Sequence, residues 1–268
     1  MKNPIFKLTS DYMKCFEFLL PSRQRKPRKK GLTMVLDKGL GFETAKSLME
    51  ISGEYVDFLK FGWGTIIIHD KDIIKKKVKM YKSFDVTPYT GGTLFEIAYM
   101  NKKVPEFFKE SKDIGFEAIE ISDGSTNMKL NEKLNFISKA KEEGFYVLSE
   151  VGKKDPKEDA AIGIEERIDL IKAELEAGSD KVIIEAREGG KNIGVFDEKG
   201  IAKEEEVDYL KKHLPEEDII WEAPNKDQQV YFILKVGKDV NLGNISTEDI
   251  TSLETLRRGL RGDTLNKL

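Results

Sequence analysis

Short apolar runs alternate with amphipathic segments from residue 31 to the end of the chain. Each run has the length and composition of a buried strand, and each amphipathic segment carries apolar residues at helical spacing. The expected strands span residues 32–36, 55–61, 85–89, 118–121, 145–148, 181–186, 218–222 and 240–242. The expected helices span about 42–52, 70–81, 131–143, 163–177, 203–213, 226–236 and 248–258, with one more that starts at 93 and breaks near Pro105.

Eight strand–helix units in a row favour a (β/α)8 TIM barrel, an α/β fold with a closed parallel sheet. An open doubly wound sheet is the main rival, but no GxGxxG fingerprint follows the first strand. The 268 residues suit one catalytic domain. We therefore expect a single barrel domain over residues 31–268, preceded by an N-terminal extension over residues 1–30.

Two basic groups lie outside the expected strands. The first belongs to the N-terminal extension, and we interpret it as a solvated arm rather than as a contact for nucleic acid or phosphate. Its residues are Arg23, Arg25, Lys26, Arg28, Lys29 and Lys30. The second group lies near the end of the last expected helix and could bind phosphate or complement the helix dipole. It consists of Arg257, Arg258 and Arg261.

The overall composition argues against a nucleic-acid or membrane partner. The formal net charge is −3, which gives no signal for either. The apolar runs fall short of the roughly 20 residues that span a bilayer, and we find no signal-peptide pattern. The one cysteine, Cys15, cannot form an internal disulfide, which suits a reducing compartment. We therefore expect a cytoplasmic protein.

Charged and amide side chains gather where the expected strands end. In a parallel barrel this end carries the active site. In strand order they are Asp37, Lys38, Lys60, Asp123, Glu150, Lys153, Glu185, Arg187, Glu222, Asn241 and Asn244. Carboxylates that share one mouth repel one another unless cations neutralise them. Two or three of the acids Asp37, Glu150, Glu185 and Glu222 could hold Mg²⁺, and others would support a lysine or arginine.

Two further features of the strand ends allow more than one interpretation. Lys153 is either a catalytic acid/base or substrate clamp, or a solvated loop lysine beside Lys154. Gly189 and Gly190 begin a glycine-rich loop after the sixth strand. Backbone N–H groups in such a loop could cradle an anion, although flexible loops often have the same composition.

These strand-end stretches resemble the phosphosulfolactate synthase family. The similarity covers about residues 31–264. Matching stretches include VLDKG (35–39), KFGWGT (60–65), GGTLFE (91–96), EISDGS (120–125), LSEVGKK (148–154), VIIEARE (182–188), EAPNK (222–226) and LETLRRGLRGDT (253–264). KFGWGT and LETLRRGLRGDT are the most specific of them.

The resemblance implies a TIM barrel, a homo-oligomer and an enzyme of coenzyme M biosynthesis. Its reaction would be the Mg²⁺-dependent addition of sulfite to phosphoenolpyruvate, which gives (2R)-phospho-3-sulfolactate. The family's catalytic lysine lies in the EVGK motif and is Lys153 here, and the motif acids, as metal ligands, are Asp37, Glu150 and Glu185. The substrate anions would be bound by Lys38, Lys60, Arg187, Gly189, Gly190 and Asn241.

This reaction is compatible with the charged strand ends. Sulfite would attack C3 of the enol, and negative charge would develop as an aci-carboxylate that Mg²⁺ stabilises. Lys153 would then protonate C2. Two alternatives remain: an aldolase-like barrel in which Lys153 forms a Schiff base, and a non-catalytic relative of a plant heat-stress-associated group that acts through protein contacts. The intact ring of charges argues against the second.

Overall fold

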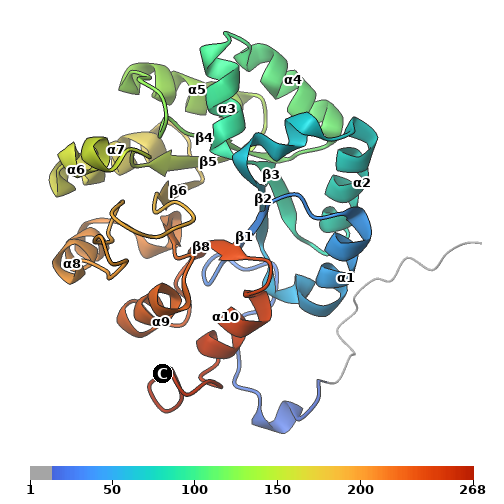
Figure 1. Ribbon diagram of the computed structural model, residues 1–268, viewed down its shortest axis with the longest axis vertical. Coiled ribbons are helices and arrows are strands. Elements are labelled where there is room, and N and C mark those ends of the chain that lie inside the picture. Colours follow the sequence, from blue (N-terminus) through green and yellow to red (C-terminus); the bar gives the residue numbers. More distant parts are fainter. Residues whose placement is uncertain (1–13) are drawn as a thin grey trace, which may run out of the picture.

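The computed structural model describes residues 14–268. Eight parallel strands pair in chain order, and β8 pairs with β1, so the sheet is a closed barrel (Figure 1). The strands are β1 Thr33–Asp37, β2 Phe58–Phe61, β3 Thr87–Thr90, β4 Ala118–Ile121, β5 Tyr146–Val151, β6 Lys181–Ile184, β7 Ile219–Glu222 and β8 Leu242–Ser246. The predicted TIM barrel is confirmed, and closure excludes the open sheet.

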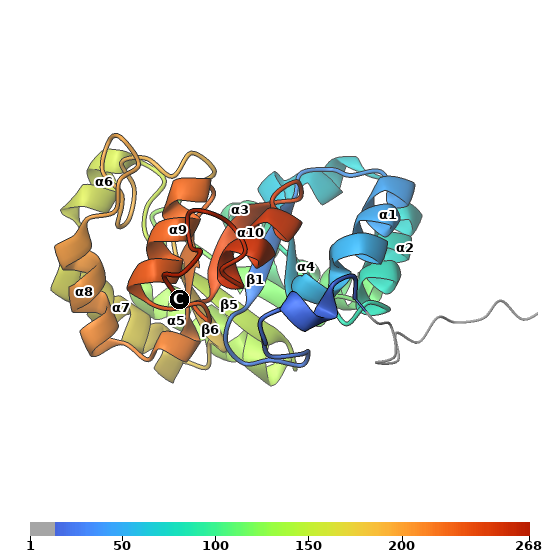
Figure 2. The same cartoon turned by 90° about the horizontal axis from the view of Figure 1, so that it is seen from below.

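Helices surround the barrel, as Figures 1 and 2 show. They are α1 Phe42–Ser52, α2 Lys71–Lys82, α3 Gly92–Met100, α4 Val104–Ile114, α5 Leu130–Glu142, α6 Pro156–Ala161, α7 Ile164–Glu176, α8 Glu204–His213, α9 Lys226–Lys235 and α10 Ile250–Arg257. The predicted break near Pro105 is confirmed: this proline lies in the first turn of α4, where its missing N–H costs no helical hydrogen bond. None of the helices between residues 14 and 268 is long and apolar enough to cross a membrane.

Several strands differ from their predicted bounds, and β2 and β8 differ at the start. Residues Gly53–Tyr55 form a 3-10 helix, η2, so β2 begins at Phe58 rather than at residue 55. The last strand, β8, begins at Leu242, whereas the prediction ended it there. Asn241 therefore precedes β8 instead of following it, which places this side chain at the opposite end of the barrel from the strand ends.

The inside of the barrel changes from apolar to charged along its axis. One buried apolar cluster includes Phe58, Ala118, Leu148, Ile183 and Ile220. Side chains alternate between the two faces of a strand, so the residue two positions further on points the same way. Those residues are charged and buried: Lys60, Glu120, Glu150, Glu185 and Glu222. Strand alternation thus delivers one lysine and four glutamates into the barrel above an apolar floor.

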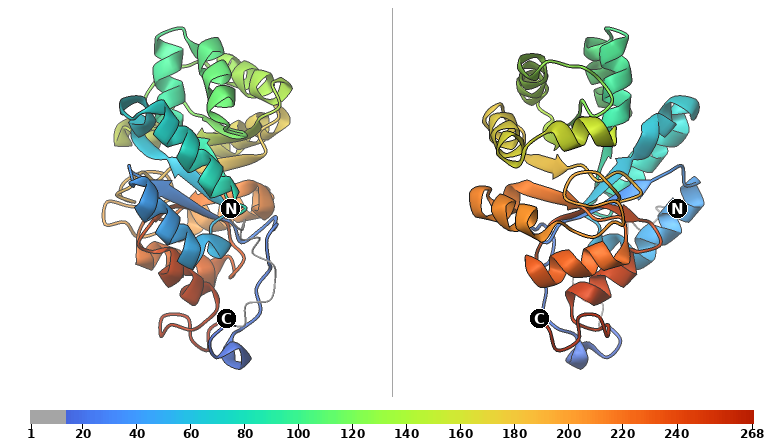
Figure 3. Two further views of the ribbon diagram at one scale, coloured as in Figure 1. Left: turned by 90° about the vertical axis from the view of Figure 1, so that its right-hand side faces the viewer. Right: turned by 60° about the vertical axis from the view of Figure 1, so that its left-hand side comes forward.

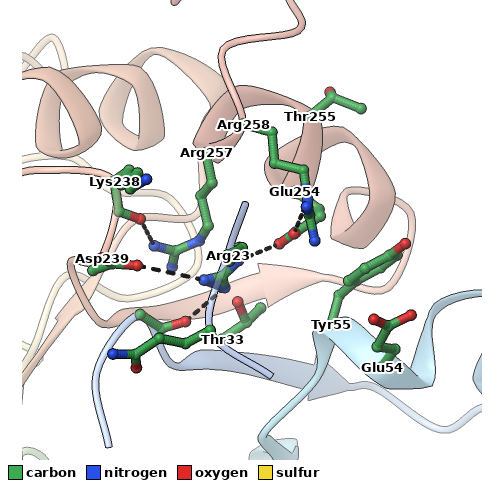
Figure 4. A network of polar contacts seen from close by, with 12 residues as sticks. Arg23, Thr33, Glu54, Tyr55, Lys238, Asp239, Glu254, Thr255, Arg257 and Arg258 are labelled. Atoms are coloured by element: carbon green, nitrogen blue, oxygen red, sulfur yellow. Dashed lines mark hydrogen bonds and ion pairs between the residues drawn. The ribbon is translucent and has the colours of Figure 1, made fainter. Parts of the chain in front are cut away.

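Arg257 closes the N-terminal end of the barrel (Figure 4). Its Nη1 donates to the carbonyl oxygens of Lys238 and Val240, at 2.7 and 2.6 Å. Its Nη2 donates to the carbonyl oxygen of Leu32 at 3.1 Å. These carbonyls belong to the segments that lead into β8 and β1, the pair that closes the sheet. Arg257 therefore stabilises closure, and it lies at the opposite end of the barrel from the C-terminal ends of the strands.

The described part of the N-terminal extension packs against the same end. Arg23 Nε donates to Glu254 Oε2 at 2.7 Å, and its side chain is 2% exposed. Arg28 Nε donates to Asp57 Oδ1 at 2.9 Å, and its side chain is 3% exposed. The expectation of a solvated arm is wrong for these two arginines, because each finds a buried carboxylate. Figure 3 shows this segment beside the C-terminal end of the chain.

Candidate active site

A polar cavity of about 130 Å³ opens at the C-terminal ends of the strands. Its charged lining consists of Lys60, Glu120, Glu150, Lys154, Glu185, Arg187, Glu188 and Glu222. A larger hollow of about 650 Å³ lies at the opposite end of the barrel. Charged side chains pair with one another there, Arg28 with Asp57 and Lys181 with Asp218. In the smaller cavity the acids outnumber the bases, so it is the better candidate for a site that binds a cation or does chemistry.

Lys60 forms the charged floor of this cavity. Its Nζ lies 3.0 Å from Glu120 Oε2. It is also 3.5 Å from Glu150 Oε2 and 3.5 Å from Glu222 Oε1. Burial opposes the charge on this lysine, but the three carboxylates outweigh burial and hold the pKa of Lys60 well above its ordinary value. Lys60 is therefore a fixed cation beneath the acids.

Three glutamates above Lys60 form a group that could hold a metal ion. Carboxylate oxygens of Glu150, Glu185 and Glu222 all lie within 4.8 Å of one another. In two of them the protein fixes one oxygen: Glu185 Oε1 accepts from the N–H of Arg187 at 2.6 Å. Glu222 Oε2 accepts from the N–H of Ala186 at 2.9 Å.

The remaining oxygens of this group are buried without a donor. Among the residues that the structure describes, nothing donates a hydrogen bond to Glu150 Oε1, Glu185 Oε2 or Glu222 Oε1. Burial, followed by the nearby charge of Glu150, raises the pKa of Glu185 well above its ordinary value. Burial raises the pKa of Glu222 to about 7, although Lys60 opposes the shift. Crowded carboxylates of this kind favour protons or a cation, and oxygen donors suit a hard divalent ion.

Two adjacent lysines after β5 have different surroundings. Lys153 Nζ donates to Asp123 Oδ2 at 2.6 Å and to the carbonyl oxygens of Asp123 and Thr126, at 2.8 and 3.1 Å. The predicted catalytic lysine is thus tied to the loop after β4 and does not line the cavity. Lys154 does line the cavity. Burial opposes its charge, but Glu150 and Glu96 raise the pKa of Lys154 to about 12, so its amine is protonated near pH 7.

The other predicted cations lie at the rim of the cavity. Arg187 lines it and donates from Nη1 to the carbonyl oxygen of Lys154 at 3.2 Å. Lys38 Nζ lies 4.9 Å from the ring centroid of Trp63 and 4.0 Å from Glu188 Oε1. Both cations are therefore placed to meet an anion that approaches from solvent.

Three non-glycine residues of the cavity lining have left-handed backbone conformations. The φ angles are 54° at Trp63, 58° at Arg187 and 53° at Asn244. Such conformations cost free energy and concentrate at functional sites, where the surrounding structure enforces them. Asn244 and Trp63 therefore join Arg187 as residues that the fold holds toward the cavity.

The remaining predicted site residues are not brought to the cavity. Asp37 Oδ2 accepts from Lys77 Nζ at 2.6 Å and from the Tyr81 hydroxyl at 2.8 Å, while Oδ1 accepts from two backbone N–H groups. Asn241 Oδ1 accepts from the N–H of Leu32, at the N-terminal end of the barrel.

The two predicted glycines of the anion loop are also engaged elsewhere. The carbonyl oxygen of Gly189 accepts from Asn225 Nδ2, and that of Gly190 accepts from Gln228 Nε2. The N–H of Gly190 donates to the carbonyl oxygen of Ala186. Two carbonyl groups of this loop therefore face neighbouring amide side chains, and the N–H of Gly190 is used within the loop instead of pointing to an anion.

Comparison with known proteins identifies the family. The family model described as (2R)-phospho-3-sulfolactate synthase (ComA) matches residues 21–263. The chain belongs to the phosphosulfolactate synthase family. The phosphosulfolactate synthase of Methanothermobacter thermautotrophicus is 58% identical over 256 residues, which cover 96% of this chain and 99% of that protein. The one from Methanocaldococcus jannaschii is 52% identical and covers 96% of this chain and 100% of its own length.

The phosphosulfolactate synthase relatives are enzymes, and so is this chain. A plant relative, Protein HEAT-STRESS-ASSOCIATED 32 of Arabidopsis thaliana, is 28% identical and covers 88% of both chains. Its identity is about half that of the two archaeal synthases, which disfavours the non-catalytic alternative. Among solved structures, 3-hexulose-6-phosphate synthase from Salmonella typhimurium superposes with a TM-score of 0.55 at 14% identity. The superposition covers 83% of this chain and 97% of the Salmonella typhimurium chain, which supports the barrel fold.

Proposed function

We propose that this enzyme catalyses the Mg²⁺-dependent addition of sulfite to phosphoenolpyruvate to give (2R)-phospho-3-sulfolactate. One observation carries the proposal beyond family membership. Three donor-free carboxylate oxygens, on Glu150, Glu185 and Glu222, lie in one cavity with the charged Lys154. A site of this kind combines a place for a divalent cation with a proton donor, and the reaction requires both.

Glu150, Glu185 and Glu222 would hold Mg²⁺, with Glu222 in the place that the sequence prediction gave to Asp37. Magnesium prefers oxygen ligands and keeps several waters, so three carboxylates are sufficient. When bound, it would neutralise the acids and stabilise negative charge on the substrate carboxylate. Lys60 stays beneath the site as a fixed cation that limits mutual repulsion of the glutamates.

The protein's own residues would then act in the following way. Arg187 and Lys38, at the rim, would receive the substrate phosphate. The sulfur lone pair of sulfite forms a bond to C3 of phosphoenolpyruvate, and the C2–C3 π electrons move toward the carboxylate as an aci-carboxylate. Lys154 donates a proton from Nζ to C2, which completes the addition without loss of any group. Its raised pKa, about 12, keeps that proton in place until the carbanion-like centre forms.

A Schiff-base reaction is disfavoured by the surroundings of both lysines. A nucleophilic lysine needs an uncharged amine, which enzymes obtain by lowering its pKa. The pKa of Lys154 is raised instead, and Lys153 Nζ already donates to three oxygens. Borohydride with substrate should therefore give no covalent adduct at either lysine, and mass spectrometry of the tryptic peptide would reveal one.

The direct test is product formation from phosphoenolpyruvate, sulfite and Mg²⁺, followed by ³¹P and ¹H NMR. The wild-type enzyme should give a sulfonated product, and chelation of Mg²⁺ should stop it. Lys154→Met should lower kcat by about 10²–10⁴-fold, the usual contribution of a general acid. The neighbouring Lys153→Met is the matched control and should retain most activity. No product from the wild type, or equal activity in the two variants, would contradict the proposal.

A further inference from the structure

Glu96 is a buried carboxylate that no part of the proposed reaction has used. Its side chain is 1% exposed, yet it lies on α3 next to two loops of the active-site end. Glu96 Oε2 accepts from Lys154 Nζ at 3.0 Å, and Oε1 accepts from the backbone N–H of Ser125 at 2.5 Å. One carboxylate thus joins the loop after β4 to the side chain of the proton donor after β5.

The position of α3 explains how Glu96 reaches these partners. Gly92 and Glu96 lie one helical turn apart on the same face of α3. A Cβ at Gly92 would come within 2.2 Å of Ser122 Oγ and 2.5 Å of Glu120 Oε1. The helix can therefore approach the end of β4 only because residue 92 is glycine. This close approach brings the next turn of the helix, with Glu96, against the loops.

The backbone N–H, the carbonyl and the ammonium group of Lys154 each form a hydrogen bond. Its backbone N–H donates to the carbonyl oxygen of Gly124 at 2.9 Å, and its own carbonyl accepts from Arg187. Its methylene chain lies over Gly124, where an added Cβ would meet Lys154 Cγ at 3.3 Å. The ammonium group has two side-chain acceptors, Glu96 Oε2 at 3.0 Å and Thr93 Oγ1 at 3.4 Å, and Glu96 is the nearer and the charged one of the two.

We propose that Glu96 is the positioning residue that aims the Lys154 ammonium group into the cavity. The inference rests on the proposed role of Lys154 as proton donor. A donor that must reach one substrate carbon gains rate from a fixed geometry, because misplacement by about 1 Å can cost about 10²-fold. Glu96 accepts two donors at once, and glutamine, with one acceptor oxygen, can satisfy only one of them.

Glu96→Gln tests this role by steady-state kinetics with both substrates. We expect kcat to fall by about 10–100-fold with KM nearly unchanged, since proton donation is needed only in the transition state. Glu96→Asp keeps both acceptor oxygens and should restore part of kcat. Glu254→Gln is the matched control: it changes a buried glutamate at the other end of the barrel and should leave kcat unchanged.

A double-mutant cycle separates positioning from general support of the fold. If Glu96 acts through Lys154, adding Glu96→Gln to Lys154→Met lowers kcat no further, because the two residues form one functional unit. The inference is overturned if the two losses add in the double variant, or if Glu96→Gln keeps the kcat of the unmodified enzyme. Either result leaves the proposed reaction standing, provided that the unmodified enzyme forms the product. If Lys154→Met has no measurable turnover, Glu96→Gln and Glu96→Asp decide the question. A lower kcat at constant KM in Glu96→Gln, partly restored in Glu96→Asp, supports the role, and an unchanged kcat in Glu96→Gln overturns it.

Discussion

The two ends of the barrel bury charged side chains in opposite ways. At the N-terminal end, arginines meet acceptors: Arg23 pairs with Glu254, Arg28 pairs with Asp57, and Arg257 donates to three carbonyl oxygens. At the C-terminal end, acids outnumber bases. Glu120, Glu150, Glu185 and Glu222 surround Lys60, and each of them has one carboxylate oxygen without a hydrogen-bond donor among the described residues.

This difference separates charges that hold the fold from charges that could hold a ligand. A buried charge whose partner is present stabilises the native state relative to the same charge left alone. Buried like charges without enough partners destabilise it, and they persist where function requires them. Changes at the N-terminal end should therefore lower stability and spare catalysis, while changes at the C-terminal end should do the reverse.

The largest effect is expected for Glu150→Gln in the cavity. It removes one ligand of the proposed Mg²⁺ site, so kcat/KM should fall by about 10³-fold, as loss of metal-ion stabilisation implies. Glu185→Gln removes a carboxylate whose pKa is raised well above its ordinary value, so thermal unfolding of that metal-free variant should occur at or above the wild-type temperature. A variant with lowered unfolding temperature and intact kcat/KM would contradict the division between the two ends.

Arg257→Met should have the converse effect. It removes one donor from each of the carbonyl oxygens of Lys238, Val240 and Leu32, of which Leu32 keeps the N–H of Leu242. The change should cost about 2–3 kcal/mol in the free energy of unfolding. Urea denaturation measures this loss. Turnover per folded molecule should remain at the wild-type value, because Arg257 lies at the end opposite the cavity. A selective loss of kcat would show that the two ends are coupled.

The stability of the metal-free enzyme should depend on pH through the cavity acids. Burial raises the pKa of Glu222 from 4.5 to about 7, so the folded protein binds this proton more tightly than the unfolded chain does. The resulting stabilisation is complete below about pH 4.5 and is lost as the pH rises through about 7. We expect a loss of about 2–3 kcal/mol over this window. Glu222→Gln should flatten that part of the pH profile, and an unchanged slope would contradict it.

The smallest effect is expected at the rim. Lys38→Ala removes an exposed cation that we place in the path of the substrate, so kcat/KM should fall by about three- to tenfold at low salt. The difference should shrink as ionic strength rises, because exposed charges are screened. Lys46→Ala, another exposed lysine, on α1, is the control and should show neither change. Equal, salt-independent rates for wild type and Lys38→Ala would remove this residue from the site.

The fold was predictable because it depends on a repeated pattern, whereas the site depends on single positions. Alternation of strands and helices is repeated eight times, so errors of a few residues at the ends of β2 and β8 did not change the topology. The same small error at β8 moved Asn241 to the wrong end of the barrel. Asn244, by contrast, was expected at the C-terminal end of this strand, and it does line the cavity.

Strand alternation distinguishes the acids that face the barrel interior from the acid that faces the helices. Val35 packs in the cluster that lies against the helices, so Asp37, two positions on, faces the helices as well. Glu120 follows Ala118 at the same interval and faces the interior, so alternation alone would have added it to the predicted site. The choice between Lys153 and Lys154 could not be made in this way, because Gly152, at φ 140°, turns the chain out of the strand pattern.

Isothermal titration of Mg²⁺ into the metal-free enzyme measures whether the unpaired carboxylates form a cation site. We expect one site per chain and, near pH 7, proton release that shows as a dependence of the heat on the buffer, since the acids lose protons as the ion binds. Glu185→Gln should abolish binding, and Glu254→Gln, at the paired end, should bind as the wild type does. Absence of binding in the wild type, or equal binding by Glu185→Gln, would contradict the assignment of Glu150, Glu185 and Glu222 as the ligands.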